Sequence, residues 1–178
     1  QLRRSHYSND LNASMDGTQV TVMGWVLTVR GHGNISFATV RDKNGDLSIV
    51  AKKGDCPDEI REKISSLKAH SSIGVTGTIK ASEKAPSGFE IIPTELRVFS
   101  EVTTIPPFEP TAKTVKNIDT RLEVRPIDLR RNILQHVFKT RSLVLKTIRD
   151  YFNDQNFVEI NTPKMIATAT EGGAALFP

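Results

Sequence analysis

Residues 16–100 alternate short stretches rich in β-branched residues with turn residues, and one amphipathic segment interrupts this pattern. The pattern predicts strands over 19–30, 35–41 and 47–52, a helix over 57–68, and two further strands over 72–80 and 90–99. This order is that of an OB-fold, a five-stranded, partly open barrel. Such a barrel buries one face of each strand, and its other face offers a concave surface for single-stranded nucleic acid.

Turn residues and proline set expectations for the strand connections. Gly31–Asn34 is expected to break the first strand, and Asn44-Gly45 supplies hairpin chemistry between the second and third. Pro93 lacks a backbone donor, so the last strand should have an edge or a bulge there. Trp25 lies in an alternating strand and is expected in the core.

Beyond the β-region, residues 103–117 contain three prolines within five residues, which stiffen the chain and exclude a regular element. We therefore predict a linker that separates a domain over 1–102 from a second domain over 118–178. Residues 131–153 form the strongest helix, with an apolar stripe made of Leu134, Phe138, Leu145, Ile148 and Phe152. Arg141 falls on this stripe, and because a buried guanidinium needs a partner, we expect a facing subunit to supply one.

Composition narrows the classes of protein. Lysine and arginine outnumber acidic residues by 24 to 20, and the pI is near 9.3, which favours a polyanion partner, although a merely basic surface is the alternative. The single Cys56 excludes an internal disulfide and fits a reducing, cytoplasmic environment. The sequence shows no secretion signal and no membrane-spanning stretch, and its four scattered histidines predict no metal site.

Two groups of residues are candidates for chemistry. Phe37 on the second strand offers a stacking plane for an unpaired base, and Arg30 nearby can contact phosphate or a base edge. The alternative is that Phe37 belongs to the core. Glu171-Gly172-Gly173 places a carboxylate beside paired glycines, which suits an ammonium group such as that of an amino acid. The alternative there is a surface turn with an exposed acid.

The order of these features resembles the class II aminoacyl-tRNA synthetases with an N-terminal OB-fold, which act on aspartate, asparagine and lysine. Gly24–Val26 and Phe37–Asp42 look like the anticodon-binding barrel of that subgroup. Arg121–Arg130 looks like the stretch leading into the catalytic domain. Arg141–Pro163 matches the first class II motif, a long helix and a strand ending in proline. Ala169–Phe177 is similar to the aspartyl enzymes of the archaeal and eukaryotic type.

The resemblance implies roles for particular residues in the barrel. Phe37 would stack on the central anticodon base and Arg30 would contact it. The family often has glutamine on the third strand where this chain has Ser48, whose shorter side chain spans the same gap only with water. A loop containing Lys84, Ala85 and Pro86 would lie near the third anticodon base. Glu90 is a weaker candidate contact.

The resemblance also implies the remainder of the enzyme. Residues 118–178 would begin an antiparallel-sheet catalytic domain in which Glu171 holds the α-amino group of L-aspartate. Arg141 and Pro163 would lie at a homodimer interface. We expect the residues that bind ATP and Mg²⁺ to lie outside this sequence, so that the chain alone forms no adenylate.

The implied reaction is ATP-dependent activation of L-aspartate and its transfer to tRNA-Asp, with tRNA-Asn left open as a second substrate. Two alternatives remain at this point: an asparaginyl-tRNA synthetase, and a non-enzymatic OB-fold module that binds single-stranded nucleic acid. A pure binding module would not need Glu171-Gly172-Gly173.

Overall fold

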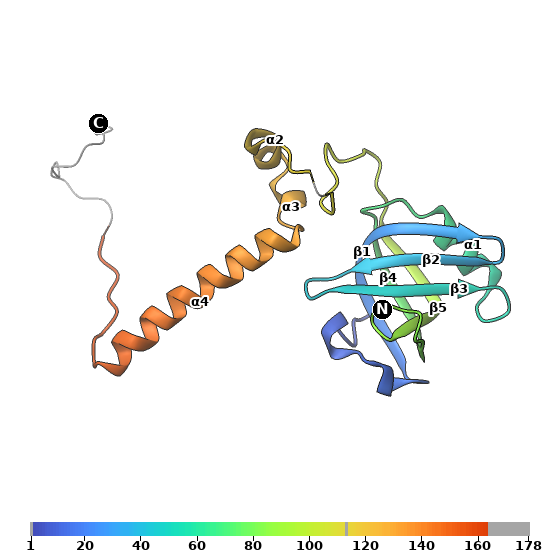
Figure 1. Ribbon diagram of the computed structural model, residues 1–178, viewed down its shortest axis with the longest axis horizontal. Helices are drawn as coiled ribbons and strands as arrows, with labels where there is room; N and C mark the ends of the chain where they lie inside the picture. The colour runs from blue at the N-terminus through green and yellow to red at the C-terminus, as the bar shows by residue number, and fades with distance from the viewer. Residues whose placement is uncertain (1, 113, 164–178) are drawn as a thin grey trace. The chain divides into compact units, whose positions relative to one another are not determined.

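A computed structural model describes residues 2–112 and 114–163 of the chain, which divides into two compact units, Gln1–Ile105 and Pro106–Pro178. Figure 1 shows a β-barrel in the first unit and helices in the second. The division falls within the proline-rich stretch 103–117, whose described residues form neither helix nor strand.

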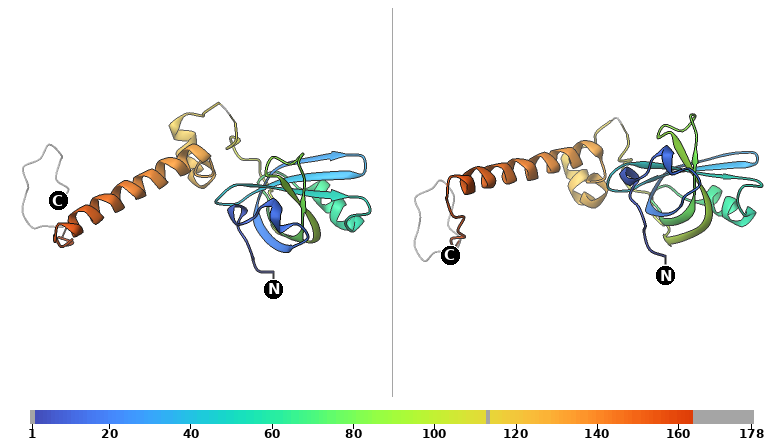
Figure 2. Two further views of the ribbon diagram at one scale, coloured as in Figure 1. Left: turned by 60° about the horizontal axis from the view of Figure 1, so that its bottom comes forward. Right: turned by 90° about the horizontal axis from the view of Figure 1, so that it is seen from below.

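The first unit is a closed barrel with strand order β1-β2-β3-β5-β4, and Figure 2 shows it from two further directions. Its elements are the short 3-10 turns η1 (Ser8–Asp10) and η2 (Ala13–Met15), the strands β1 (Gln19–His32), β2 (Ile35–Arg41) and β3 (Asp46–Lys52), the helix α1 (Asp58–Ser66), and the strands β4 (Ser72–Ala81) and β5 (Phe89–Ser100). Neighbouring strands pair antiparallel, except that β3 and β5 close the barrel in parallel at Ile49 and Ile91. The predicted OB-fold is confirmed.

Alternate residues of each strand fill the barrel, as the period of two requires. Fully buried side chains come from every strand and from α1: Val20, Val22, Val26, Val40, Leu47, Ile49, Ile64, Ile73, Val75, Ile79 and Ile91. Burying one such side chain stabilises the fold by about 1.5–3 kcal/mol. Because this core belongs to residues 11–91, the barrel has its own source of stability.

β1 differs from the prediction at both its end and its centre. It continues through Gly31 to His32, because Gly33 adopts a φ of +59° and closes a two-residue turn with Asn34. The break expected over Gly31–Asn34 is therefore confirmed at Gly33 and Asn34, and is wrong at Gly31 and His32. Trp25 is half-buried instead of lying in the core, since its neighbour Val26 points inward and adjacent side chains alternate between faces.

The bulge predicted at Pro93 is confirmed. Thr76 pairs with Glu95 and Gly77 with Pro93, so that Thr94 is an extra residue on β5. A Cβ atom on Gly77 would lie 2.4 Å from the carbonyl oxygen of Ile92, which explains why glycine occupies this close approach.

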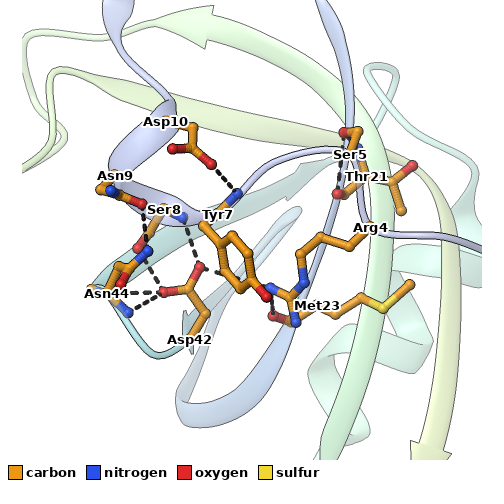
Figure 3. A network of polar contacts seen from close by, with 11 residues as sticks. Arg4, Ser5, Tyr7, Ser8, Asn9, Asp10, Thr21, Met23, Asp42 and Asn44 are labelled. Atoms are coloured by element: carbon orange, nitrogen blue, oxygen red, sulfur yellow. Dashed lines mark hydrogen bonds and ion pairs between the residues drawn. The ribbon is translucent and has the colours of Figure 1, made fainter.

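The turn between β2 and β3 is closed by a carboxylate (Figure 3). Asp42 accepts hydrogen bonds from the amides of Asn44 and Gly45 at 2.7 and 3.0 Å. Neither Asn44 nor Gly45 has a positive φ, so the predicted hairpin forms without the type I′ geometry typical of Asn-Gly. Asp42 also accepts from the amide and hydroxyl of Ser8 at 2.6 and 2.7 Å. The buried side chain thereby joins the hairpin to the N-terminal segment.

The N-terminal segment lies along β1 and is held by several further contacts, which the sequence did not predict. The Arg4 guanidinium donates to the carbonyl of Met23 at 2.9 Å, and the Ser5 amide donates to the carbonyl of Thr21 at 2.9 Å. Two cations also contact the ring of Tyr7. The guanidinium carbon of Arg4 lies 4.3 Å from the ring centre, and the ammonium nitrogen of Lys43 lies 4.1 Å from it. Cation–π contacts of this kind add about 0.5–1 kcal/mol at exposed positions.

The second unit contains α2 (Ile118–Glu123), α3 (Arg125–Asp128) and α4 (Asn132–Asp154). The carboxylate of Asp128 is fully buried and accepts hydrogen bonds from Arg121 Nε at 2.9 Å and from Arg125 Nη1 at 2.7 Å. Arg131 Nη1 forms a longer ion pair with it at 3.8 Å. A buried carboxylate requires such charged partners, so this cluster fixes the short helices at the start of α4.

The predicted helix over 131–153 is confirmed as α4, but its apolar stripe is exposed except for the half-buried Leu134. The motif Arg141–Pro163 was expected to end in a strand after this helix, but residues 157–163 form no strand in the structure. A strand requires a hydrogen-bonded neighbour, and the described part of the unit is otherwise helical. Phe157 packs edge-on against Phe152, and Arg149 Nε lies 3.1 Å from Glu159.

We expect Asp42→Asn to destabilise the barrel by about 1.5–3 kcal/mol at pH 7, because hydrogen bonds to a charged acceptor are lost. Burial raises the pKa of Asp42, but the hydrogen bonds from Ser8, Asn44 and Gly45 lower it further, and the net pKa lies below the ordinary 3.8. The stabilisation is therefore complete above pH 3.8 and is lost as the pH falls through the lowered pKa.

Urea unfolding of the wild type and of Asp42→Asn between pH 2 and 7 measures this difference, with the exposed Asp55→Asn as the matched control. A difference between wild type and Asp42→Asn that stays constant over the whole pH range would contradict the assignment.

Candidate nucleic-acid interface

The outer face of β1, β2 and β3 contains a hollow of about 480 Å³. It is lined by Thr28, Arg30, Gly31, His32, Phe37, Ala38, Thr39, Ser48, Ile49 and Pro86. Three of the residues predicted to contact an anticodon, Arg30, Phe37 and Ser48, are therefore brought together on one surface.

Strand alternation places Phe37 in this hollow. Its neighbours Ser36 and Ala38 are buried, whereas the Phe37 side chain faces outward and is 39% exposed. The interpretation of Phe37 as a core residue is wrong. Arg30 lies directly opposite Phe37 in the β1–β2 register, so the two side chains leave neighbouring positions on the same face of the barrel.

Hydroxyl groups form the adjacent part of the hollow. Thr28 pairs with Thr39 across β1 and β2, and Thr39 pairs with Ser48 across β2 and β3. The Thr28 hydroxyl donates to the Thr39 hydroxyl at 3.2 Å. The result is a row of three hydroxyls two residues along the strands from Arg30 and Phe37.

The other predicted contacts lie around the hollow in different ways. Pro86 lines it, whereas Lys84 is exposed and Ala85 is buried in the turn between β4 and β5. Glu90 is half-buried and pairs with Lys80. Because Ile49 pairs in parallel with Ile91, the preceding residues Ser48 and Glu90 lie on the same outer face of neighbouring strands.

Arg30 supplies the fixed charge among the residues that line the hollow. Arg41 is engaged elsewhere, since its guanidinium forms two hydrogen bonds with Asp46 at 2.5 and 2.7 Å. An aromatic plane, one fixed cation and several hydroxyls match an unpaired base attached to a phosphate. This chemistry is that of an interface for single-stranded nucleic acid.

Sequence reasoning missed Thr28, His32 and Thr39 as lining residues. The two threonines could have been found, because each lies two positions from a residue that was singled out, Arg30 or Phe37, and shares its face. His32 was assigned to a turn and so was not placed on a strand.

The remaining predicted residues belong to the second unit. Arg141 and Pro163 are exposed in the structure, and Glu171 lies outside the described residues. No group of three or more histidine, cysteine or acidic side chains able to hold a metal occurs within residues 2–112 and 114–163. Over the same residues, the structure has no helix with the length and hydropathy that crossing a membrane requires.

Family models match both units. The model described as OB-fold nucleic acid binding domain matches residues 20–99, and the model of class II tRNA synthetases (D, K and N) matches residues 117–178. The chain thus joins a nucleic-acid-binding barrel to class II synthetase sequence. Residues 117–178 belong to the class II tRNA synthetase family of the aspartate, lysine and asparagine group.

Individual relatives agree with this assignment. The chain is 46% identical over 176 residues to the aspartate–tRNA(Asp/Asn) ligase of Methanocaldococcus jannaschii. This alignment covers 99% of the chain and 40% of that protein. Among solved structures, the asparaginyl-tRNA synthetase of Pyrococcus horikoshii complexed with asparaginyl-adenylate superimposes with a TM-score of 0.87 at 28% identity. The match covers 99% of this chain and 40% of the synthetase chain. For the aspartyl-tRNA synthetase of Entamoeba histolytica the shares are 94% and 41%, with a TM-score of 0.82 at 26% identity. The chain spans about 40% of the length of the curated relatives it matches.

Removal of the aromatic plane should weaken RNA binding strongly. We expect Phe37→Ala to lower the affinity for an anticodon stem-loop by about five- to more than hundredfold, since stacking of one base contributes about 1–3 kcal/mol. Phe37→Trp should retain binding because it keeps a stacking plane. Fluorescence anisotropy with labelled stem-loops measures the affinities.

Phe99→Ala is the matched control, because Phe99 is similarly exposed on the barrel and does not line the hollow. Equal losses for Phe37→Ala and Phe99→Ala would show that the hollow is not where the base binds.

Proposed function

We propose that this chain is the anticodon-binding domain, over 1–102, a linker, over 103–117, and the first part of the catalytic domain, over 118–178, of an aspartate–tRNA ligase. The observation that carries the proposal is the outward-facing pair of Phe37 and Arg30 in an OB barrel that continues into class II synthetase sequence. The 46% identity to an aspartate–tRNA(Asp/Asn) ligase supports aspartate as the amino acid.

The barrel acts by holding an unpaired anticodon base. The central base stacks on Phe37, Arg30 contacts its edge or its phosphate, and Ser48 lies within the same hollow. Codons for aspartate and asparagine share a central adenosine, so the central anticodon base is uridine in both tRNAs. A barrel that reads this base accepts both tRNA-Asp and tRNA-Asn.

Discrimination between the two tRNAs therefore depends on the third anticodon base. We propose that the loop with Lys84, Ala85 and Pro86 makes this contact, which is supported by Pro86 lining the hollow and by the exposure of Lys84 in the same turn. The lysine supplies a charge for phosphate, and Glu90 offers an acceptor on the neighbouring strand.

The complete enzyme would join aspartate to tRNA in two steps. The carboxylate of aspartate attacks the α-phosphate of ATP, which gives aspartyl-adenylate and releases pyrophosphate. A hydroxyl of the terminal ribose of tRNA then takes the aspartyl group and releases AMP. Family membership implies the use of ATP. We further propose that Mg²⁺ accompanies it and that Glu171 binds the α-amino group of aspartate.

Two other functions were open from the sequence. An asparaginyl-tRNA synthetase has the same fold, but the solved asparaginyl enzyme is 28% identical to this chain, against 46% for the aspartate relative. A pure nucleic-acid-binding module does not account for the synthetase match over 117–178. Thermal protection of the full-length protein by aspartate, and not by asparagine, separates the two synthetases.

The main test is binding of the chain to anticodon stem-loops at two salt concentrations. We expect the loops of tRNA-Asp and tRNA-Asn to bind within a few-fold of each other, and both to bind at least tenfold more tightly than a loop whose central uridine is replaced by a purine. Affinity should fall with rising salt because phosphates are contacted. Equal affinity for all three loops would contradict anticodon recognition.

We also propose that α4 forms the homodimer interface of the complete enzyme. Its stripe exposes Phe138, Leu145, Ile148 and Phe152 with Arg141 among them, and Pro163 ends the segment that follows. An apolar surface of this extent is typical of an interface. Arg141 would then pair with an acidic group or a carbonyl of the facing subunit.

We expect Leu145→Lys to abolish self-association of the chain, because a charge would be buried in the middle of the stripe. Sedimentation velocity over a range of concentrations measures this. Thr147→Lys adds the same charge away from the stripe and should leave association unchanged. Unaltered association of Leu145→Lys would remove α4 from the interface.

A further inference from the structure

We propose that Thr39, oriented by Thr28, is a further specificity-determining residue of the hollow that donates a hydrogen bond to the central anticodon base. This inference rests on the proposed function, since it names an additional contact to the same base. It is carried by the strand register, by the hydrogen bond between the two threonines and by their place in the hollow.

The register places two rows of side chains side by side. Arg30 and Phe37 form one row across β1 and β2, and Thr28, Thr39 and Ser48 form the next. Residues two positions apart on a strand are separated by about 6.6 Å, and neighbouring strands by about 4.8 Å. A base that lies flat on the Phe37 ring can therefore reach the row of hydroxyls with its polar edge.

The hydrogen bond between the threonines sets the direction of the next one. A hydroxyl carries one proton and two acceptor lone pairs. The Thr28 hydroxyl donates its proton to the Thr39 oxygen at 3.2 Å, so the proton of Thr39 remains available to donate into the hollow. A hydroxyl that accepts one hydrogen bond becomes a stronger donor, because chains of hydrogen bonds polarise one another.

A donor at this position selects a base with an acceptor on its edge. Uracil presents the carbonyl oxygen O4 where cytosine presents an amino group, which is itself a donor. Thr39 can still accept from the amino group of cytosine with its second lone pair, but its own proton would then lack an acceptor on the base. Thr39 therefore favours uracil over cytosine, whereas stacking on Phe37 alone accepts either base.

The same arrangement accounts for the short side chain of Ser48. A serine on β3 reaches less far than an amide would, but its direct neighbour across the strands is Thr39. Two hydroxyls on adjacent strands together cover the edge of one base. The selectivity of the hollow is thus distributed over β2 and β3 instead of being assigned to one long side chain.

The test uses the whole chain and two anticodon stem-loops of tRNA-Asp. One has uridine at the centre, and the other has a difluorotoluene nucleotide, an apolar isostere that stacks but accepts hydrogen bonds poorly. We expect Thr39→Val to weaken binding of the uridine loop about five- to tenfold, in line with one lost hydrogen bond, and to leave the isostere loop unchanged. Thr39→Ser, which keeps the hydroxyl, should bind both loops like the wild type.

Thr76→Val is the matched control. The hydroxyl of Thr76 makes an equivalent cross-strand contact with the hydroxyl of Thr21, at an oxygen–oxygen distance of 3.0 Å, and this pair does not line the hollow. Equal weakening of both loops by Thr39→Val, or weakening of neither, would overturn the inference. If Phe37→Ala weakens binding while Thr39→Val does not, only the inference fails. If the unaltered chain binds no stem-loop, the proposed function fails and the inference with it.

Discussion

The alternation of side chains along five paired strands is the constraint on which the rest of the first unit depends. On β2 the same seven residues supply Ala38 and Val40 to the core and Phe37 and Thr39 to the outer face. A shift of register by one residue would bury the ring of Phe37 and expose the core. The packing of the apolar interior therefore also fixes which side chains form the interface, because core and interface residues alternate along the same strand.

Closure of the barrel turns this alternation into a surface. Arg30, Phe37 and Ser48 come from three strands, and cross-strand pairing brings them to neighbouring positions with little freedom to move apart. The carboxylate of Asp42 secures the far end of β2 and β3 and attaches the N-terminal segment to them. Rigid strands with short side chains around one aromatic ring position a base without the ordering cost that a flexible loop would carry.

Much of this could be predicted from the sequence, because the signals were local. Strand periodicity identified the barrel, Pro93 identified the bulge, and the spacing of Phe37 from Arg30 identified an aromatic and a cation near one connection. The failures concern information that a single segment does not contain. The attachment of the hairpin to the N-terminal segment depends on Ser8, which is 34 residues away from Asp42. The hydroxyl row depends on the register of three strands, and the strand expected over 157–163 depends on a pairing partner.

The two units differ in what stabilises them. The barrel buries a continuous cluster of aliphatic side chains contributed by every strand and by α1. In the described residues of α2, α3 and α4, the buried side chain is that of Asp128, which arginines contact, whereas most apolar residues of α4 are exposed. Salt bridges offset the cost of burying a charge but contribute little net stability. The helical unit therefore requires additional apolar contacts for its stability, and its long exposed stripe is the surface on which such contacts would form.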